Sequence, residues 1–325
     1  MSARAESALV LDQVVVDYQR KHMPTVRAVA GVDLAVNVGE VHGLVGESGC
    51  GKSTLARAAT GIVPIASGSI EFDGQPVSTL SRRPRPRHFR RLQMVFQDPH
   101  ASLNPRRSIG SQLEDALKRA GDVPSDRRRE RIEQLLDTVG ISPTAAGRFP
   151  HEFSGGQRQR ICIARALAAD PKVIIADEPI SSLDASAQAQ IANLLVSLTR
   201  ELELGVLLIS HDLAIIQHVA DVVSVMYLGK IVESAPKRAL WSEPLHPYSE
   251  ALLAAAPLHD GERTLPQGLP GEIPDPARPP LGCRFHPRCK HAFEPCPTEE
   301  PLLEHVASER RCACWLRTRA TANAA

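Results

Sequence analysis

The chain has 325 residues, with 38 Lys and Arg against 37 Asp and Glu, which gives a formal net charge of +1. This balance excludes the strongly basic footprint of a nucleic-acid-binding protein. No run approaches the ~18 consecutive apolar residues of a membrane-spanning helix, and the N-terminus lacks the apolar core of a signal peptide. We therefore expect any membrane pore to come from other chains.

Residues 1–95 indicate β-rich segments around a glycine-rich loop. Val41–Val45 predicts a short buried strand, residues 46–53 have the sequence GESGCGKS, and residues 53–59 begin a good helix former. A strand that leads through glycines into a helix aims backbone N–H groups and the positive end of the helix at an anion. Lys52 can reach the outer phosphates of a nucleotide, and the Ser53 hydroxyl can ligate Mg²⁺. The alternative is an ordinary strand–turn–helix with glycines for tightness.

Residues 98–165 have a helical pattern. One stretch has an apolar face at the i, i+3, i+4, i+7 spacing of a helix packed on the core, formed by Ile132, Leu135, Leu136 and Val139. Near the end of the segment, Ser154–Gln157 precedes the helical residues 158–169. It therefore predicts a second helix N-terminus suited to phosphate.

Two later apolar runs predict strands that are buried on both faces of a parallel sheet. Val173–Ala176 is followed by Asp177 and Glu178, and Val206–Ile209 is followed two positions later by His211. Ligands bind at the carboxyl edge of such sheets. Asp177 suits the Mg²⁺ shell, and Glu178 suits a general base for an attacking water. His211 could contact a γ-phosphate, or it could simply be a polar cap of its strand.

The composition changes after Pro257. Eleven of the 26 prolines fall between Pro257 and Pro301, which predicts a constrained, mostly irregular segment after the helical residues 249–256. Five of the seven cysteines lie in the last 43 residues, at Cys283, Cys289, Cys296, Cys312 and Cys314. Disulfides do not suit a reducing cytosol, and the spacing lacks the close pairs of common zinc folds. We place a thiolate-held iron–sulfur cluster first, zinc second and free cysteines third.

The motifs, in this order, resemble those of the ATP-binding subunits of ABC transporters over essentially the whole chain. Gly46–Ser53 looks like the Walker A loop and Val173–Glu178 like Walker B with its catalytic glutamate. Phe153–Gln157 looks like the family signature, with Phe where Leu is more usual. Gln97, after the strand-like residues 92–96, matches the Q-loop glutamine, and Ser181–Asp184 matches the D-loop. His211 matches the switch histidine, and Tyr18 matches the aromatic residue that stacks on adenine.

The resemblance implies an α/β fold of the P-loop NTPase class, with a RecA-like core, a β-rich subdomain and an inserted helical subdomain at residues 98–165. The nucleotide contacts that it implies are Tyr18, Gly46, Glu47, Ser48, Gly49, Cys50, Gly51, Lys52, Ser53, Thr54, Ser154, Gly155, Gly156, Gln157, Asp177 and Asp184. Mg²⁺ would be held by Ser53, Gln97 and Asp177, and catalysis would use Glu178, His211 and Gln97. In the family, the signature faces the Walker A loop of a second subunit, so each ATP site is complete only in the dimer.

The C-terminal part resembles the extension of dipeptide and oligopeptide importer ATPases. Residues 179–184 and 52–57 resemble the second of the two ATPase types in such importers. In the C-terminal part, the similar motifs are His246–Tyr248, Leu269–Pro274 and Gly282–Cys289. Some members carry a [4Fe–4S] cluster in this region. The resemblance implies a cluster with a structural or sensing role, remote from the ATP chemistry, on Cys283, Cys289, Cys296 and Cys314. His286, His291 and Cys312 are the substitute ligands.

The resemblance also implies a function and an assembly. It makes residues 1–257 an ABC nucleotide-binding domain and 258–325 the extension of an ATPase that drives peptide import at the cytoplasmic face of the cell membrane. The implied partners are a second ABC ATPase subunit, two transmembrane permease subunits docked near residues 97–105, and an extracytoplasmic solute-binding protein. The alternatives are an importer of nickel complexes or sugars, a soluble ABC-type ATPase acting on nucleic acid or ribosomes, and a non-catalytic regulatory subunit.

Overall fold

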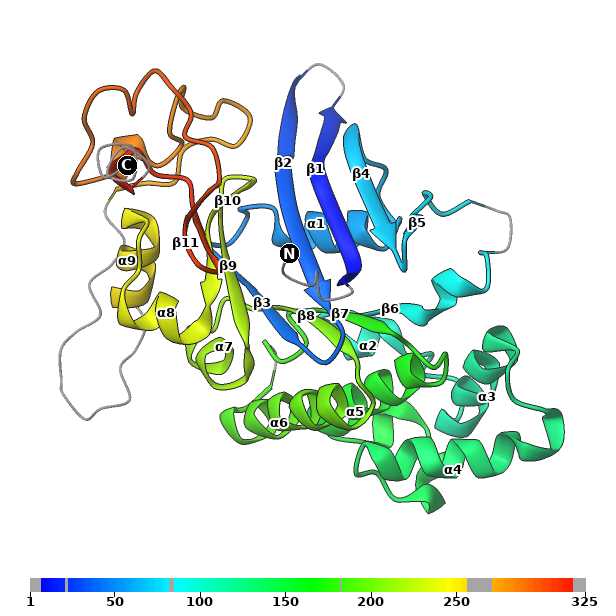
Figure 1. Cartoon of the computed structure of the whole chain (residues 1–325). Helices are drawn as coiled ribbons and strands as arrows, with labels where there is room; N and C mark the ends of the chain where they lie inside the picture. The colour runs from blue at the N-terminus through cyan, green and yellow to red at the C-terminus, as the bar shows by residue number, and fades with distance from the viewer. Residues whose placement is uncertain (1–6, 21–22, 82–84, 182, 256–270, 318–325) are drawn as a thin grey trace. The chain divides into compact units, whose positions relative to one another are not determined.

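The structure, a computed structural model, describes residues 7–20, 23–81, 85–181, 183–255 and 271–317 (Figure 1). Ser182 of the D-loop-like run, and Leu269 and Pro270 of the Leu269–Pro274 motif, lie outside these residues. The chain divides into two compact units, each assembled from segments far apart in sequence. Unit 1 consists of residues 1–9, 36–41 and 72–209, and unit 2 of residues 10–35, 42–71 and 210–325.

Unit 1 contains three parallel strands in the spatial order β8–β7–β6. Their bounds are β6 (Leu92–Val95), β7 (Val173–Asp177) and β8 (Gly205–Ile209). All residues of β7 and β8 are buried, as the continuous apolar runs predict. Val95 is in register with Ala176, and Asp177 with Ile209. The carboxyl ends of the three strands therefore meet at one edge.

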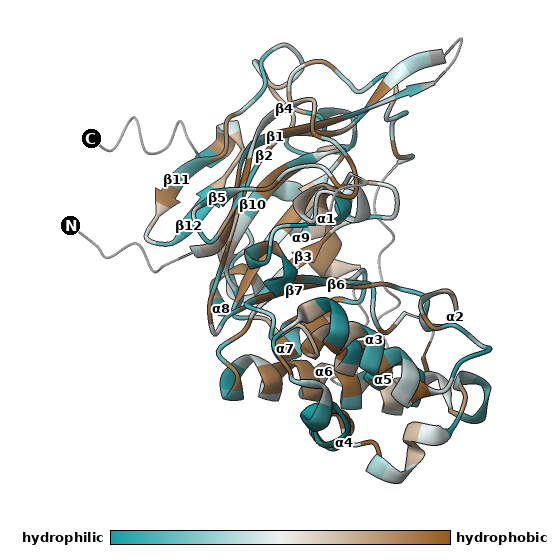
Figure 2. Ribbon diagram, turned by 90° about the vertical axis from the view of Figure 1, so that its right-hand side faces the viewer, coloured by the Kyte–Doolittle hydropathy of each residue, from teal (hydrophilic) through white to brown (hydrophobic). Residues whose placement is uncertain are grey.

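The other elements of unit 1 are mostly helices from the predicted helical region and beyond. They are β5 (Gln75–Pro76), α2 (Pro99–Ser102), α3 (Ile109–Ala120), α4 (Arg128–Thr138), α5 (Gly155–Leu167), α6 (Ala185–Glu201), and the short 3₁₀ helices η1 (His88–Arg91), η2 (Ser125–Arg127), η3 (Pro143–Gly147) and η4 (Pro150–Glu152). Helix α5 contacts β6, and α6 contacts β8. Both helices alternate between apolar and polar residues in Figure 2, as expected of helices that bury one face. The predicted apolar face of α4 is buried, with Leu136 and Val139 fully enclosed.

Unit 2 contains parts of two sheets. It includes most of the first sheet, and in the second sheet it includes β3 except for that strand's first residue. In the first, β2 (Met23–Asn37), β1 (Ser7–Arg20) and β4 (Ser67–Phe72) lie side by side. In the second, β3 (Val41–Val45) is parallel to β9 (Val222–Tyr227), and β9 is antiparallel to β10 (Lys230–Pro236). The helices are α1 (Lys52–Ala59), α7 (Leu213–Val219), α8 (Lys237–Ser242), α9 (Pro247–Ala254) and the 3₁₀ helix η5 (His286–Arg288).

The described part of the extension, residues 271–317, is mostly irregular, as its prolines predict, but it also forms a hairpin that the sequence did not indicate. Strand β11 (Glu304–Ala307) pairs with β12 (Arg310–Cys312), and β12 pairs with β10, so the extension continues the second sheet. On β10, the fully buried Glu233 accepts backbone N–H groups from Leu245 and His246. Arg310 of β12 lies 3.5 Å from the same carboxylate.

Candidate nucleotide site and cysteine-rich extension

The loop between β3 and α1 has a backbone that requires glycine at two positions. Gly46 has φ 153° and Gly51 has φ 111°. A Cβ at Gly46 would lie 2.1 Å from the carbonyl oxygen of Met226, and one at Gly51 would lie 2.2 Å from that of Ala28. The two glycines thus let the loop pass against its neighbours and enter α1 directly. The first N–H groups of this helix have no partners within the helix and suit an anion.

Lys52 lies inside this loop, and its side chain turns back on the loop backbone. Its Nζ donates to the carbonyl oxygens of Gly46 at 2.7 Å and Glu47 at 2.9 Å, and it lies 3.6 Å from the Sγ of Cys50. The residue is 4% exposed, so its charge is largely shielded from water. Burial raises the pKa of Cys50, which keeps the adjacent thiol neutral.

Tyr18 is brought to the start of α1 by strand β1. Its Oη lies 3.5 Å from Oγ1 of Thr54, and both residues are half-buried. The aromatic ring is therefore next to the helix that follows the loop, where the resemblance puts the adenine. Ser53 is half-buried at the same helix start.

Glu47 is held by three other residues of unit 2. Its carboxylate accepts two hydrogen bonds from Arg288, with Nη1–Oε2 at 2.8 Å and Nη2–Oε1 at 3.1 Å. Its backbone N–H donates to Tyr248 Oη at 2.9 Å, and its carbonyl accepts from Lys52. The hydrogen bond to Glu47 is the main cause of a raised pKa of Arg288. Because Arg288 directly precedes Cys289, the extension is in contact with the loop between β3 and α1.

The carboxyl edge of the strands in unit 1 collects three predicted site residues. Asp177 ends β7 and is 4% exposed. Glu178 follows it in a left-handed conformation, φ 47°, with its N–H donating to the carbonyl of Ile209 at 3.0 Å. Gln97, just beyond β6, donates through Nε2 to Glu178 Oε2 at 3.3 Å and to Ser181 Oγ at 3.2 Å. The amide and two carboxylates are thus grouped where Mg²⁺ and an attacking water would be handled.

The signature residues cap helix α5. Ser154 Oγ accepts from the N–H of Gln157, and the Gln157 side chain accepts from the N–H of Ser154, which is a capping box. A Cβ at Gly155 would lie 3.0 Å from a Leu183 side-chain carbon, and one at Gly156 would lie 3.1 Å from the Cβ of Ala187. The two glycines therefore let the helix start lie against the segment that leads into α6.

The remaining predicted residues also begin helices or follow strands. Asp184 caps α6 by accepting from the N–H of Ala187 at 2.9 Å. His211, in unit 2, is exposed just after β8, and Asp212 next to it caps α7. An exposed imidazole at a strand end is accessible to a ligand. Cys162 is buried in α5, and burial raises its pKa to about 11, so it is a core residue.

Three thiols of the extension have a pKa that is raised by burial and by neighbouring thiols. Burial raises the pKa of Cys283 to about 12, with further contributions from Cys314, Cys296 and Cys289. Burial also raises the pKa of Cys314 to about 11 and that of Cys289. Together with Cys296, these are the four thiols of the predicted ligand set. Cys312 is fully buried in β12 opposite Glu233.

The donor chemistry of these thiols fits an iron–sulfur cluster, although their arrangement shows no preformed metal site. In the described residues, no two of the seven cysteines are joined by a disulfide. In the described ranges, no group of three or more His, Cys, Asp and Glu side chains is arranged to hold a metal ion. A protein ligand shell for a cluster consists of cysteine thiolates, and a bound metal deprotonates thiols whose pKa burial has raised.

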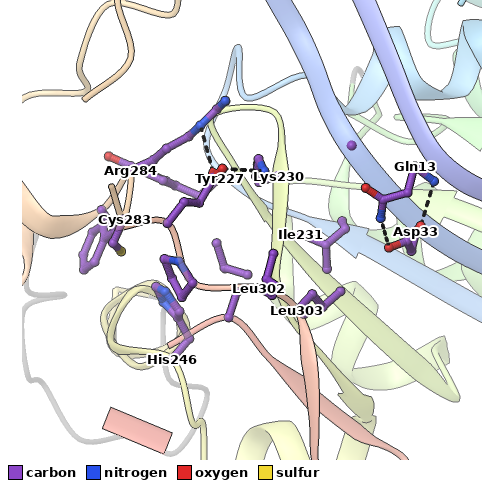
Figure 3. Close-up of a pocket in the computed structure, with 16 residues that line it drawn as sticks. Gln13, Asp33, Tyr227, Lys230, Ile231, His246, Cys283, Arg284, Leu302 and Leu303 are labelled. Atoms are coloured by element: carbon purple, nitrogen blue, oxygen red, sulfur yellow. Dashed lines mark hydrogen bonds and ion pairs between the residues drawn. The ribbon is translucent and has the colours of Figure 1, made fainter. Parts of the chain in front are cut away.

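A pocket of about 80 Å³ lies where the extension meets the strands of unit 2 (Figure 3). Tyr227 and Phe285 meet edge to face on its wall, with ring centroids 5.3 Å apart. Lys230 lies 2.9 Å from Glu300. The extension is therefore packed on β9 and β10 through both aromatic and charged contacts.

A glycine loop that leads into a helix beginning with a buried lysine, together with a buried strand that ends in carboxylates, defines a P-loop nucleotide-binding protein. Residues 29–181 match the family model described as ABC transporter, and residues 232–296 match that of the oligopeptide/dipeptide transporter C-terminal region. The chain belongs to the ATP-binding proteins of ABC transporters, and within them to the branch with this C-terminal region. In the described residues, no helix is long and apolar enough to cross a membrane.

Several relatives match over most of their length. The di/tripeptide transport ATP-binding protein of Pseudomonas aeruginosa is 48% identical over 290 residues, which cover 89% of this chain and 90% of the relative. The oligopeptide transport ATP-binding protein of Bacillus subtilis is 46% identical over 303 residues, which cover 92% of each.

Two solved structures share the fold. One, from Clostridium perfringens, is cbiO1, part of the ABC transporter complex cbiONQ. It has a TM-score of 0.63 and 29% identity, and the match covers 73% of this chain and 92% of that one. The other is an ATP-binding cassette solved as a dimer in a post-hydrolysis state with ADP and Pi. Its TM-score is 0.62 at 26% identity, with 71% and 99% covered. The α/β P-loop NTPase fold and the ATPase class are thereby confirmed.

Three hydrogen bonds of the site were not predicted from the sequence. They join Arg288 and Tyr248 to Glu47, and Gln97 to Ser181. Arg288, Tyr248 and Ser181 lie within motifs of the family resemblance, which did not indicate these partners. For Arg288 and Tyr248, the hydrogen-bond partner in the loop lies more than 200 positions earlier in the chain.

Proposed function

We propose that this chain hydrolyses ATP to drive the uptake of di- or oligopeptides through a membrane transporter. The observation that carries the proposal is the phosphate loop with its seated Lys52 in the same chain as a C-terminal region of the oligopeptide/dipeptide transporter type. The names of these relatives, whose matches cover about nine-tenths of the chain, support peptides as the solute.

The proposed roles follow from the chemistry of each side chain. Lys52 exchanges its two carbonyl partners for the outer phosphates, because a charge-assisted contact with phosphate is stronger than one with a neutral carbonyl. Ser53, Gln97 and Asp177 hold the Mg²⁺ of the substrate. Glu178 accepts the proton of the attacking water or orients it. His211 contacts the γ-phosphate.

The second half of each ATP site is proposed to come from another ATPase subunit. Ser154–Gln157 at the start of α5 presents a helix N-terminus to an anion, and Asp184 starts the next helix. In this proposal the signature and Asp184 contact ATP bound to the partner's loop. Closure of the pair excludes water and aligns the attacking one with Glu178.

The proposed assembly also includes two transmembrane permease subunits and an extracytoplasmic solute-binding protein, with this chain peripheral at the cytoplasmic membrane face. The segment after Gln97 suits a docking role. Asp98 caps α2, and Arg158 donates to the exposed His100 there. The short, capped helix and its polar side chains support this docking proposal.

The transported solute is tested with the assembled transporter in proteoliposomes. Uptake of labelled di- and oligopeptides should require ATP on the side of this chain. It should fall to background with Glu178→Gln in this chain and the corresponding substitution in the second ATPase subunit. Uptake of a nickel complex or a sugar, with no uptake of peptides, would show that the proposed solute class is wrong and would identify the other one. ATP hydrolysis stimulated by nucleic acid or ribosomes, without any assembly with permeases, would overturn the proposal.

We also propose that residues 258–325 form a distinct extension in which Cys283, Cys289, Cys296 and Cys314 hold a [4Fe–4S] cluster. The support is the electrostatic proximity of these four thiols and the cysteine preference of such clusters. Anaerobically purified protein should be brown and contain iron and sulfide. Colourless protein with stoichiometric zinc would establish zinc in the same site, and metal-free protein with ordered residues 271–317 would exclude both.

A further inference from the structure

We propose that Arg288 is a positioning residue for the phosphate loop: through Glu47 it holds the loop in its ATP-binding form, and it thereby couples the cysteine-rich segment to ATP affinity. The inference rests on the proposed ATP binding by Lys52 and its loop. It holds whether or not the extension contains a cluster, because it concerns only the path between the two segments.

The pair of charges is enclosed and geometrically specific. Arg288 and Glu47 share two parallel hydrogen bonds, and their side chains are 3% and 15% exposed. The guanidinium also donates to Tyr227 Oη at 3.3 Å and lies 5.9 Å from the ring centroid of Phe285. A bidentate pair of this kind fixes orientation as well as distance. Removal of one member leaves the other charged and poorly solvated.

Glu47 transmits this anchor directly to the phosphate-binding lysine. The carboxylate is fixed by Arg288, the N–H by Tyr248, and the carbonyl is one of the two that seat Lys52. A shift of Glu47 therefore displaces the loop backbone on which the phosphates are proposed to bind. Without Arg288, the Glu47 carboxylate would also be an uncompensated negative charge on the loop that must accept a polyphosphate. Both effects weaken ATP binding.

The backbone that carries Arg288 is tied to three of the cysteines. Arg288 ends the short helix η5, between Cys283 and Cys289. The N–H of Cys283 donates to the carbonyl of Cys296 at 2.8 Å, and the N–H of His286 donates to that of Cys283 at 2.9 Å. The N–H of Cys289 donates back to the carbonyl of His286 at 3.2 Å. A change in these cysteines therefore displaces the turn that holds Arg288, and linkage requires that ATP binding act back on the same turn.

The test is a double-mutant cycle in ATP affinity, measured by equilibrium titration on the full chain. Arg288→Met should raise the ATP dissociation constant by about tenfold or more, since truncation of one partner strands a buried charge. The double variant Arg288→Met with Glu47→Gln should bind ATP more tightly than Arg288→Met alone, because the stranded carboxylate is gone. The ATP affinity of Arg288→Lys should lie between those of wild type and Arg288→Met, because an ammonium restores the charge but not the pair of parallel N–H donors of the guanidinium.

Arg284→Met is the matched control. Arg284 lies in the same turn region, donates to the carbonyl of Leu228 and lies 3.8 Å from Glu300, so it anchors the extension through partners other than Glu47. Its loss should leave ATP affinity within about twofold of wild type if only the Glu47 path matters. Thermal unfolding of every variant separates loss of the fold from loss of the loop geometry.

Two results would overturn the inference. One is ATP binding by folded Arg288→Met within about twofold of wild type. The other is a double variant that binds no better than Arg288→Met, which would make Arg288 a structural anchor of the extension only. A wild-type chain that binds no ATP would instead contradict the proposed function. The two failures are thus distinguishable.

Discussion

The side chain of Lys52 is held inside a nearly closed loop because two backbone carbonyls accept hydrogen bonds from its Nζ. Glu178 is positioned by its backbone conformation and by two hydrogen bonds. Its backbone is left-handed and hydrogen-bonded to Ile209, while the Gln97 amide reaches its carboxylate. A left-handed conformation is uncommon for a residue with a Cβ, and its occurrence at a candidate catalytic position fits the clustering of backbone strain at functional sites.

Substitution Glu178→Gln should retain ATP and Mg²⁺ binding and remove most of the steady-state hydrolysis by the assembled transporter. The amide has the shape of the carboxylate, but it cannot accept a proton from the attacking water. Phosphate release and ATP affinity should be measured on the same preparation. Near-normal turnover by the variant would remove Glu178 from the catalytic role.

Substitution Lys52→Ala should act on binding, in contrast to Glu178→Gln. Loss of a charge-assisted phosphate contact is worth about 1.5–3 kcal/mol, or roughly ten- to a hundredfold in the ATP dissociation constant. Equilibrium titration with ATP gives this number directly. If ATP bound to the variant as tightly as to wild type, Lys52 would not be the phosphate ligand.

His246 should make the stability of the fold depend on pH. Complete burial lowers its pKa to about 3, while the unfolded chain has the ordinary value of about 6.5. Between these values the unfolded state binds a proton that the folded state does not. The free energy of unfolding should therefore fall as the pH decreases below ~6.5, by up to about 1.4 kcal/mol per pH unit from this group.

The matched variant is His246→Asn. Asn can still accept the N–H of Tyr248 at the start of α9, as Nδ1 of His246 does, but it does not titrate. Denaturant unfolding between pH 7 and 5 should give a shallower pH dependence for the variant, whatever its absolute stability. Equal slopes would assign the acid sensitivity to other groups.

At the scale of the elements, the site residues sit where strands stop and helices start. Gln97 and Asp177 come from the ends of β6 and β7, which the parallel register places at one edge. Ser154 and Asp184 cap α5 and α6 with their own side chains. Each of these residues thus has a local structural role, and this role also fixes the direction in which its side chain points. The extension is different, because its short elements are held by β10, Glu233 and Glu47.

Substitution Cys289→Ser should bleach the brown colour of the proposed cluster and also weaken ATP binding. The first effect follows from loss of a thiolate ligand, and the second from displacement of the adjacent Arg288. Anaerobic absorption spectra and ATP titrations should be compared with those of Cys162→Ser, since Cys162 is buried in α5 outside the extension. A bleached variant with unchanged ATP affinity would contradict the coupling and leave the cluster proposal intact.

At the scale of the whole molecule, the predicted ATP-site residues are divided between the two compact units. Tyr18, Lys52 and His211 belong to unit 2, while Glu178 and the signature belong to unit 1. In addition, the proposed mechanism assigns the signature to a partner's ATP. The isolated chain should therefore hydrolyse ATP slowly and be accelerated by the second ATPase subunit and the permeases.

This acceleration can be measured as turnover per ATPase subunit at increasing protein concentration, with and without the partners. Turnover should rise with association, because a complete site requires two chains. A Ser154→Arg variant should still bind ATP in its own loop but should reduce turnover at the partner's site. Full activity of the dilute isolated chain would contradict a shared site.

Taken by itself, the sequence determined the features that are local in the chain. The strand–glycine–helix order around Lys52 and the buried runs before Asp177 and His211 are present as predicted. The helix that follows Ser154 is also present, but it begins at Gly155, three residues before the predicted start. These features depend on hydrophobic period, glycine and capping residues within about ten positions of one another, so a single sequence displays them.

Only the tertiary structure decided which distant segments support the loop. Arg288 and Glu47 are 241 positions apart, Tyr248 and Glu47 are 201 apart, and β12 joins the sheet beside β10. Such contacts depend on chain folding over hundreds of residues and leave no periodic pattern in the sequence. For that reason the cysteine-rich extension looked separate from the ATP loop in the sequence, whereas the packing of Arg288, Tyr227 and Phe285 joins the two.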